Sequence, residues 1–136
     1  MITKYKHLIC HQTPLPWIVD KGTDLIGTKE IVGSKHNPEI LRWAKVLGIE
    51  KTYTNDEIPW CGLYVAKVCQ LAKKYVVEKP LWARNWLKWG VGVPNAGLGD
   101  ILVFKRGSGG HVGFYIGEDD TCYYVLGGNQ NNMVNI

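Results

Sequence analysis

Three residues have the chemistry and the local setting to act together in acyl transfer. Cys61 follows Pro59 and Trp60 at the expected first turn of a helix, where unpaired N–H groups and the helix dipole favour a thiolate. His111 opens an expected strand and is the candidate base. Asn129 follows two glycines and is the candidate group that fixes the imidazole tautomer. Cysteine hydrolases that form a thioester intermediate use such a set.

Each of these residues also has a purely structural interpretation. Cys61 shares a helical stripe with Tyr64 and Val68, and free cysteine is among the most buried residue types. His111 directly follows a glycine-rich turn, which also suits a histidine at the solvent edge, and Gly-Gly-Asn129 is ordinary turn chemistry. The polar residues that can replace Asn129 are Gln130, Asn131 and Asn132.

The cysteine pattern indicates free thiols. The four cysteines are Cys10, Cys61, Cys69 and Cys122. None forms a Cys-x-x-Cys pair, and disulfides are rare in the cytosol. We expect Cys69 to be buried and inert, and Cys122 to be packed in a strand. His7, Cys10 and His11 would face one way on a helix, as zinc ligands can, but nothing nearby supplies a fourth ligand. We therefore expect no metal and no cofactor.

The helices and strands that must position these residues are predicted from the spacing of apolar residues and from the Gly, Pro and capping residues between them. Helices are expected over residues 17–26, 38–47, 61–75 and 83–89, and strands over 100–105, 111–117, 121–127 and 133–136. Helices followed by an antiparallel meander predict an α+β fold, with N-terminal helices packed on a small antiparallel sheet. We expect one domain over residues 1–136, with a lead-in segment at 1–15 and a core at 16–136.

Composition narrows the choice of partner. The net charge is +4, but no dense Lys/Arg run indicates nucleic-acid binding. No apolar run approaches the roughly 20 residues of a membrane span, so no membrane insertion is expected. The N-terminus lacks a secretory signal pattern, which predicts synthesis in the cytoplasm without a signal peptide. Six Trp and seven Tyr suit a groove for a sugar- or peptide-like ligand, or alternatively a core.

The chain resembles the NlpC/CHAP superfamily of papain-like cysteine hydrolases, and in particular a phage- and prophage-associated, endolysin-like branch. The resemblance spans about residues 16–136. Its blocks are "IGTKEIVGSKHNP" (26–38), "PWCGLYV" (59–65), "ARNWLKWG" (83–90) and "GDILVFKRGSGGHVGFYIGED" with "VLGGNQNNMVNI" (99–119 and 125–136). Gly62 follows the cysteine where a small residue such as Ala or Ser is common.

The resemblance implies hydrolysis of amide bonds in peptidoglycan stem peptides. Cys61 would be the nucleophile, His111 the general base and acid, and Asn129 the orienting group. The implied partner is bacterial peptidoglycan, reached through a holin or carried by a virion, and a monomer is favoured. The residues implied to line the groove are Trp60, Arg84, Trp86, Ser108, Gly109 and Gly110.

Two other functions stay open from the sequence. A non-catalytic wall-binding or virion structural module would keep the fold without a working triad. A toxin-type amidase would use the same triad on another amide. The bond that a wall hydrolase would cleave is also open, since an endopeptidase and an N-acetylmuramoyl-L-alanine amidase need the same three groups.

Overall fold

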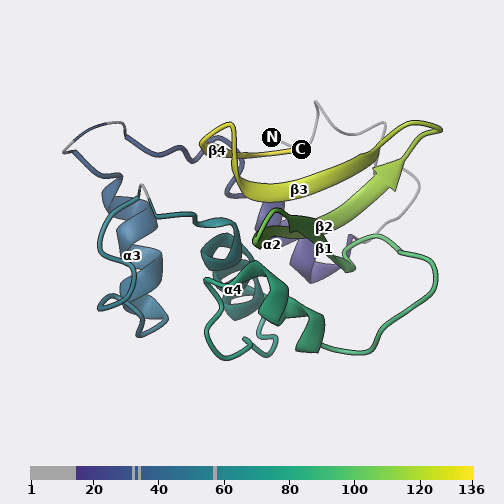
Figure 1. Ribbon diagram of the computed structural model, residues 1–136, viewed down its shortest axis with the longest axis horizontal. Helices are drawn as coiled ribbons and strands as arrows, with labels where there is room; N and C mark the ends of the chain where they lie inside the picture. Colours follow the sequence, from purple (N-terminus) through teal and green to yellow (C-terminus); the bar gives the residue numbers. More distant parts are fainter. Residues whose placement is uncertain (1–14, 32, 34, 57) are drawn as a thin grey trace.

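The computed structural model describes residues 15–31, 33, 35–56 and 58–136. The chain forms an α+β domain in which α4 packs against a four-stranded antiparallel sheet (Figure 1). This confirms the expected succession of helices and then strands. Among the helices of these described ranges, none has the length and apolarity that a membrane crossing requires.

The helices are shorter than the sequence pattern suggests. They are α2 (Trp17–Thr23), α3 (Pro38–Val46), α4 (Cys61–Leu71) and the 3-10 helix η2 (Ala83–Lys88). Asn37 caps α3 as expected, since its side-chain oxygen accepts from the Glu39 N–H at 2.8 Å. Helix α4 ends at Leu71 rather than near Tyr75, and Lys73 follows in the left-handed region at φ 57°.

The strands are longer than expected on the side of the candidate site. They are β1 (Ile101–Arg106), β2 (Gly109–Glu118), β3 (Tyr123–Gln130) and β4 (Met133–Asn135), paired in that order. Strand β3 runs through the Gly-Gly-Asn stretch that was expected to be a turn. The turn is confined to Asn131 and Asn132, whose φ values of 53° and 61° suit a two-residue hairpin.

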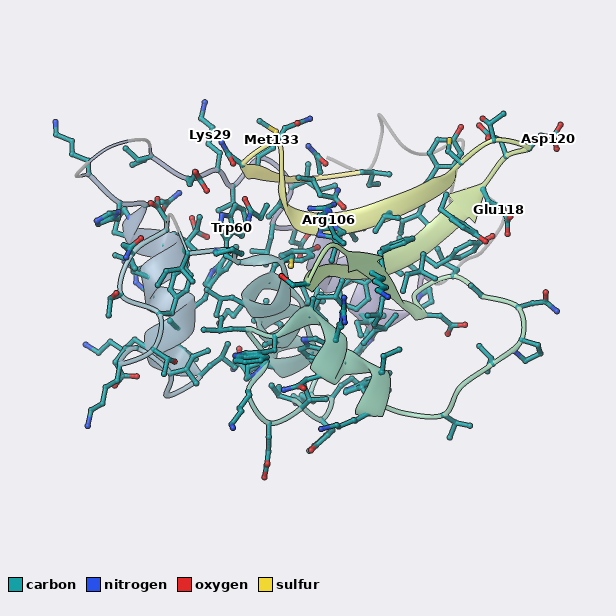
Figure 2. The ribbon with its side chains drawn as sticks, in the orientation of Figure 1. Lys29, Trp60, Arg106, Glu118, Asp120 and Met133 are labelled. Atoms are coloured by element: carbon teal, nitrogen blue, oxygen red, sulfur yellow. The ribbon has the colours of Figure 1, made fainter. Side chains whose placement is uncertain are left out.

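An N-terminal segment covers the free edge of β4. The Gly27 N–H donates to the Val134 carbonyl at 3.0 Å, and the Val134 N–H donates to the Thr28 carbonyl at 2.7 Å. Lys29 forms an isolated antiparallel β-bridge with Met133, and the two labelled residues lie together in Figure 2. These bonds pair backbone groups of a strand edge that would otherwise be open to another chain.

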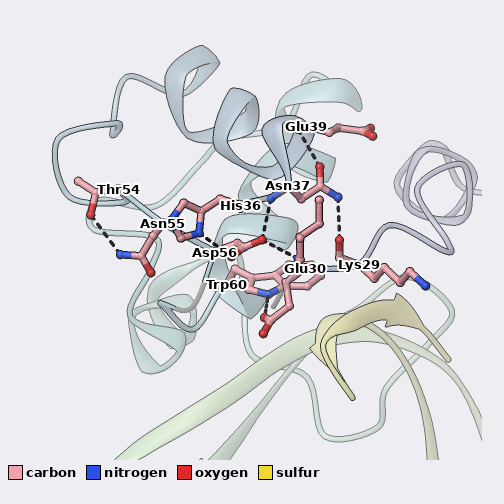
Figure 3. A network of polar contacts seen from close by, with 10 residues as sticks. Lys29, Glu30, His36, Asn37, Glu39, Thr54, Asn55, Asp56 and Trp60 are labelled. Atoms are coloured by element: carbon pink, nitrogen blue, oxygen red, sulfur yellow. Dashed lines mark hydrogen bonds and ion pairs between the residues drawn. The ribbon is translucent and has the colours of Figure 1, made fainter. Parts of the chain in front are cut away.

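A buried carboxylate fixes the loop that connects this segment to α3. Both oxygens of Asp56 are used: Oδ2 accepts from the N–H groups of Ile31 and Asn37, and Oδ1 contacts His36 Nδ1 at 3.0 Å (Figure 3). Burial raises the pKa of Asp56, but these hydrogen bonds outweigh burial, so the pKa is lower than usual. The charged carboxylate thus holds the loop in place.

The core lies between α4 and the inner face of the sheet. Val112, Phe114 and Ile116 on β2 are buried, which confirms the predicted apolar face of that strand. The Tyr64 ring meets Phe114 edge-on at 6.1 Å, and the Tyr64 hydroxyl donates to the Gly22 carbonyl in α2. Helices α2 and α4 and the sheet therefore meet around one aromatic side chain.

Gly62 is required by a close approach of two chain segments. A Cβ at this position would overlap the backbone carbonyl of Pro80, which a side-chain rotation cannot relieve. The glycine after the cysteine thus lets the segment before η2 pack directly onto the first turn of α4.

We predict that Gly62→Ala lowers the free energy of unfolding by about 1–3 kcal/mol, the usual cost of overpacking. Urea denaturation followed by tryptophan fluorescence measures this. Gly92→Ala is the matched control, because nothing lies within 4 Å of its Cβ position. Equal stability of the two variants would contradict the close approach of Pro80.

Candidate functional site

Cys61 is one of the residues that line a cleft. Cys61 is the first residue of α4 and is only 5% exposed. The cleft has a volume of about 500 Å³. Its other lining residues are Thr52, Ile58, Pro59, Leu81, Trp82, Ala83, Arg84, Ser108, Gly109 and Gly110. A ligand in this cleft would therefore lie next to Cys61, between the start of α4, the start of η2 and the β1–β2 turn.

Four of the six expected groove residues line this cleft, and two do not. Arg84, Ser108, Gly109 and Gly110 line it together with Cys61. Trp60 and Trp86 are core residues, at 0% and 1% exposure. The Trp60 indole donates to Glu30 (Figure 3), and the Trp86 indole donates to the Pro80 carbonyl at 2.9 Å. The tryptophan that lines the cleft is Trp82, which is 70% exposed and was not predicted.

Arg84 both lines the cleft and fixes the turn that forms one wall. Its Nε donates to the Gly109 carbonyl at 2.7 Å, and its Nη2 donates to the Gly107 carbonyl at 2.9 Å. The turn itself is tight, with Gly107 at φ 56°. Since Gly109 begins β2, this guanidinium also anchors the start of the strand that carries His111.

Burial decides the protonation of Cys61. Desolvation raises its pKa, whereas the N–H groups of Val112, Gly62 and Cys61 itself and the charge of Arg106 lower it. Burial outweighs the others, so the pKa lies above the ordinary value. The N–H groups at the helix start do lower the Cys61 pKa, as expected, but burial raises it by more, so the net direction is toward the neutral thiol.

His111 is also neutral at rest, and its ring is fixed by Gln130. Burial lowers the His111 pKa, the Gln130 hydrogen bond raises it, and the Arg106 charge lowers it further. The net pKa is below the usual value. The ring Nε2 lies 2.9 Å from Gln130 Oε1. A buried, uncharged imidazole of this kind is able to accept a proton.

The orientation of the Gln130 amide assigns the imidazole tautomer. Its Nε2 donates toward the Val125 carbonyl, the Asn135 carbonyl and Asn135 Oδ1, at 3.1, 3.0 and 2.8 Å. The reversed amide would aim its oxygen at three other oxygens. Gln130 Oε1 must therefore face His111 and accept from Nε2–H, which leaves His111 Nδ1 unprotonated.

Asn129 does not occupy the position expected of the orienting group. It lies in a bulge of β3, with φ 56°, where the pairing with β4 shifts between Gly127 and Gln130. The bulge turns the next side chain, Gln130, toward the ring. Gly127 leaves space for this contact, because a Cβ there would come within 2.5 Å of Gln130 Oε1. Gln130 thus replaces Asn129 as the hydrogen-bond partner of His111.

Cys61 and His111 lie on two elements that pack together, α4 and β2, near the point where β3 stops pairing with β2. The pairing of β2 with β3 extends only from Glu118↔Tyr123 to Phe114↔Leu126, and β3 then pairs with β4. The Val112 N–H donates to the Cys61 thiol and lowers its pKa. His111, adjacent along β2, lies on the alternate face, where its ring stacks on Phe104 at 6.3 Å. In the described part of the chain, no hydrogen bond joins the thiol to the ring.

The other cysteines differ from Cys61 in their surroundings. Cys69 is fully buried as predicted, and burial raises its pKa to about 12, which favours the unreactive thiol. Cys122 was expected to be packed in a strand, but it is exposed in the β2–β3 turn beside Asp119. The interpretation of His7, Cys10 and His11 as zinc ligands lies outside the described residues. Within residues 15–31, 33, 35–56 and 58–136, no group of three His, Cys, Asp or Glu side chains is placed to hold a metal.

Comparison of the chain with protein-family models, with curated proteins and with solved structures finds no match.

We predict that His111 is the Nε2–H tautomer at neutral pH. Long-range ¹H–¹⁵N spectra of protein labelled at histidine measure this directly, with His111→Ala assigning the signal among the four histidines. Gln130→Glu should raise the His111 pKa, because a carboxylate favours the imidazolium. Asn129→Glu should raise the His111 pKa by less, because Asn129 is not the hydrogen-bond partner of the ring. An Nδ1–H tautomer would contradict the arrangement.

Proposed function

We propose that the protein is a cysteine hydrolase of bacterial peptidoglycan with a papain-like NlpC/CHAP core. The observation that carries the proposal is the packing of Cys61 against the backbone of the strand that carries His111. Cys61, on the first turn of α4, lines a cleft, and the Val112 N–H of β2 donates to its sulfur. The residue before Val112 on that strand is His111, a neutral imidazole held by Gln130. Cys61 is the nucleophile, His111 the general base and acid, and Gln130 the positioning residue.

The protonation states favour general-base catalysis over a preformed ion pair. The Cys61 pKa is raised and the His111 pKa is lowered, so both groups are neutral near pH 7. Attack on the substrate carbonyl then needs transfer of the thiol proton to His111 Nδ1 as the C–S bond forms. Catalytic hydrogen bonds are often longer in free enzymes and tighten with substrate, so the thiol–imidazole hydrogen bond is expected to form in the substrate complex.

The remaining steps return each group to its starting state. The tetrahedral intermediate carries an oxyanion, which the backbone N–H of Cys61 at the start of α4 can stabilise. Collapse breaks the C–N bond, and the imidazolium gives its proton to the leaving amine. The resulting thioester is attacked by water, from which His111 takes a proton. Breaking the C–S bond then releases the carboxylic acid, and Cys61 regains its proton.

The cleft supports a peptide-like substrate that lies between aliphatic and polar walls. Ile58, Pro59 and Leu81 supply apolar contacts, whereas Ser108 and the glycines of the β1–β2 turn offer backbone polar groups. An acidic stem peptide would also be attracted by the net charge of +4. The proposal places the enzyme at the cell wall, delivered by a holin or a virion.

A second candidate is a wall-binding or virion structural module that does not catalyse. The absence of a thiol–imidazole hydrogen bond among the described residues favours it. A toxin-type amidase acting on another amide would share every step above, and only its substrate distinguishes it.

We predict that Cys61→Ala and His111→Ala each lower the release of amino groups from purified peptidoglycan by at least about 100-fold, the usual scale of acid–base catalysis. Cys69→Ala is the matched control and should keep the activity, since this thiol is buried and inert. Circular dichroism checks that each variant is folded. Unchanged activity in Cys61→Ala would contradict the assigned nucleophile. No release by the wild type would support the structural module or another amide substrate.

A further inference from the structure

We infer that the face formed by Tyr75, Lys79, Trp82 and Lys88 binds the glycan strand of peptidoglycan. The stem peptide attached to that strand would pass over Trp82 into the Cys61 cleft. This inference rests on the proposed function, since it names the part of the same substrate that lies outside the catalytic cleft.

Trp82 connects two neighbouring grooves. One is the cleft that contains Cys61. The other has a volume of about 360 Å³ and is lined by Tyr75, Val77, Glu78, Lys79, Trp82, Asn85 and Lys88. Trp82 and Tyr75 are 70% and 66% exposed, which is unusual for side chains of this size. A polymer lying in the second groove would therefore continue past the indole to the thiol.

The aromatic groove is held in shape before any ligand arrives. The Trp89 indole donates to the Tyr75 carbonyl at 2.7 Å, and the Trp86 indole donates to the Pro80 carbonyl at 2.9 Å. Asn85 Nδ2 donates to the carbonyls of Glu78 and Lys79, both at 3.2 Å. These bonds fix the backbone from Tyr75 to Trp82, so binding need not order a loop.

The positive charge of the chain is concentrated in the sequence segment that contains this groove. Residues 66–98 contain six of the sixteen Lys and Arg residues and only one of the twelve Asp and Glu residues, Glu78. The rest of the chain carries ten basic and eleven acidic residues, so this segment accounts for the net positive charge. Lys79 and Lys88 bring that charge into the groove itself. Charge complementarity therefore favours an anionic polymer.

An amino-sugar strand bearing acidic peptides matches both features. One face of a sugar ring consists of C–H groups, which pack on Tyr75 and Trp82, while its hydroxyls reach the polar rim at Glu78 and Asn85. The free carboxylates of the stem peptide would pair with Lys79 and Lys88. A polyanion without sugars would pair with Lys79 and Lys88 but would not pack on the aromatic rings. A neutral glycan would pack on the rings but would not pair with the lysines.

The experiment measures binding separately from cleavage. Cys61→Ala protein is titrated calorimetrically with a soluble wall disaccharide–tetrapeptide, with the disaccharide alone and with the tetrapeptide alone. Tyr75→Ala should weaken binding of the disaccharide–tetrapeptide by about tenfold, the size of one lost aromatic contact. Binding of the tetrapeptide alone should not change. Lys79→Gln with Lys88→Gln should reduce the salt dependence of binding to the disaccharide–tetrapeptide.

The matched control is Trp17→Ala, which removes an exposed aromatic side chain of α2 that is 62% exposed. Equal effects of Tyr75→Ala and Trp17→Ala on glycan binding would overturn the inference. In the active protein, Tyr75→Ala should raise KM for peptidoglycan and leave kcat unchanged. Ring-dependent binding by a wild type that cleaves nothing would support the surface and contradict the hydrolase. Cleavage by the wild type, with unchanged KM and unchanged binding in Tyr75→Ala, would support the hydrolase and contradict the glycan-binding surface.

Discussion

The candidate site depends on the point at which β3 stops pairing with β2. Beyond Phe114↔Leu126 the two strands part, and β3 continues with β4 through a bulge. The separation leaves the backbone of β2 open to the start of α4. There the Val112 N–H donates to the Cys61 thiol and lowers its pKa. The same bulge aims Gln130 at His111. A regular hairpin would close this gap, because ladder hydrogen bonds would occupy the backbone groups at the site.

The strand separation is supported from both layers. On the helical side, Gly128 lies so close to Trp60 and Tyr64 that a Cβ there would come within 2.5 Å of the Tyr64 Cβ. On the outer side, Asn135 in β4 accepts from the Gln130 amide, and its own Nδ2 donates to the Gln130 carbonyl at 3.0 Å. The loop fixed by Asp56 adds a third support, since Glu30 accepts from the Trp60 indole (Figure 3). The position of the thiol thus depends on contacts with distant parts of the sequence.

Sequence patterns predicted the elements better than the contacts between them. Asn37 with Pro38, and the alternation of Val112, Phe114 and Ile116, encode local structure directly and were confirmed. The partner of His111 was not predictable, because a one-residue bulge decides which of several adjacent polar side chains faces the ring.

Exposure at the site was predicted less well for a related reason. Trp82 precedes η2, whereas Trp86 lies one turn inside it. A helical pattern therefore could have indicated that Trp86 is the buried one. The protonation of Cys61 was missed because the helix start is visible in the sequence but the degree of burial is not. A pKa depends on the balance of the two effects, and only tertiary packing sets that balance.

The central claim is that the buried Cys61 thiol and the buried His111 imidazole are both neutral in the free protein. The most direct test is the rate of Cys61 alkylation by iodoacetamide across the range from about pH 5 to 10, followed by peptide mass spectrometry with exposed Cys122 as internal reference. Because the Cys61 pKa is raised, we expect its rate to rise throughout this range, with the same profile in His111→Ala. A high rate that stays flat from acidic to neutral pH and is lost in His111→Ala would reveal a thiolate–imidazolium pair, and would contradict the claim.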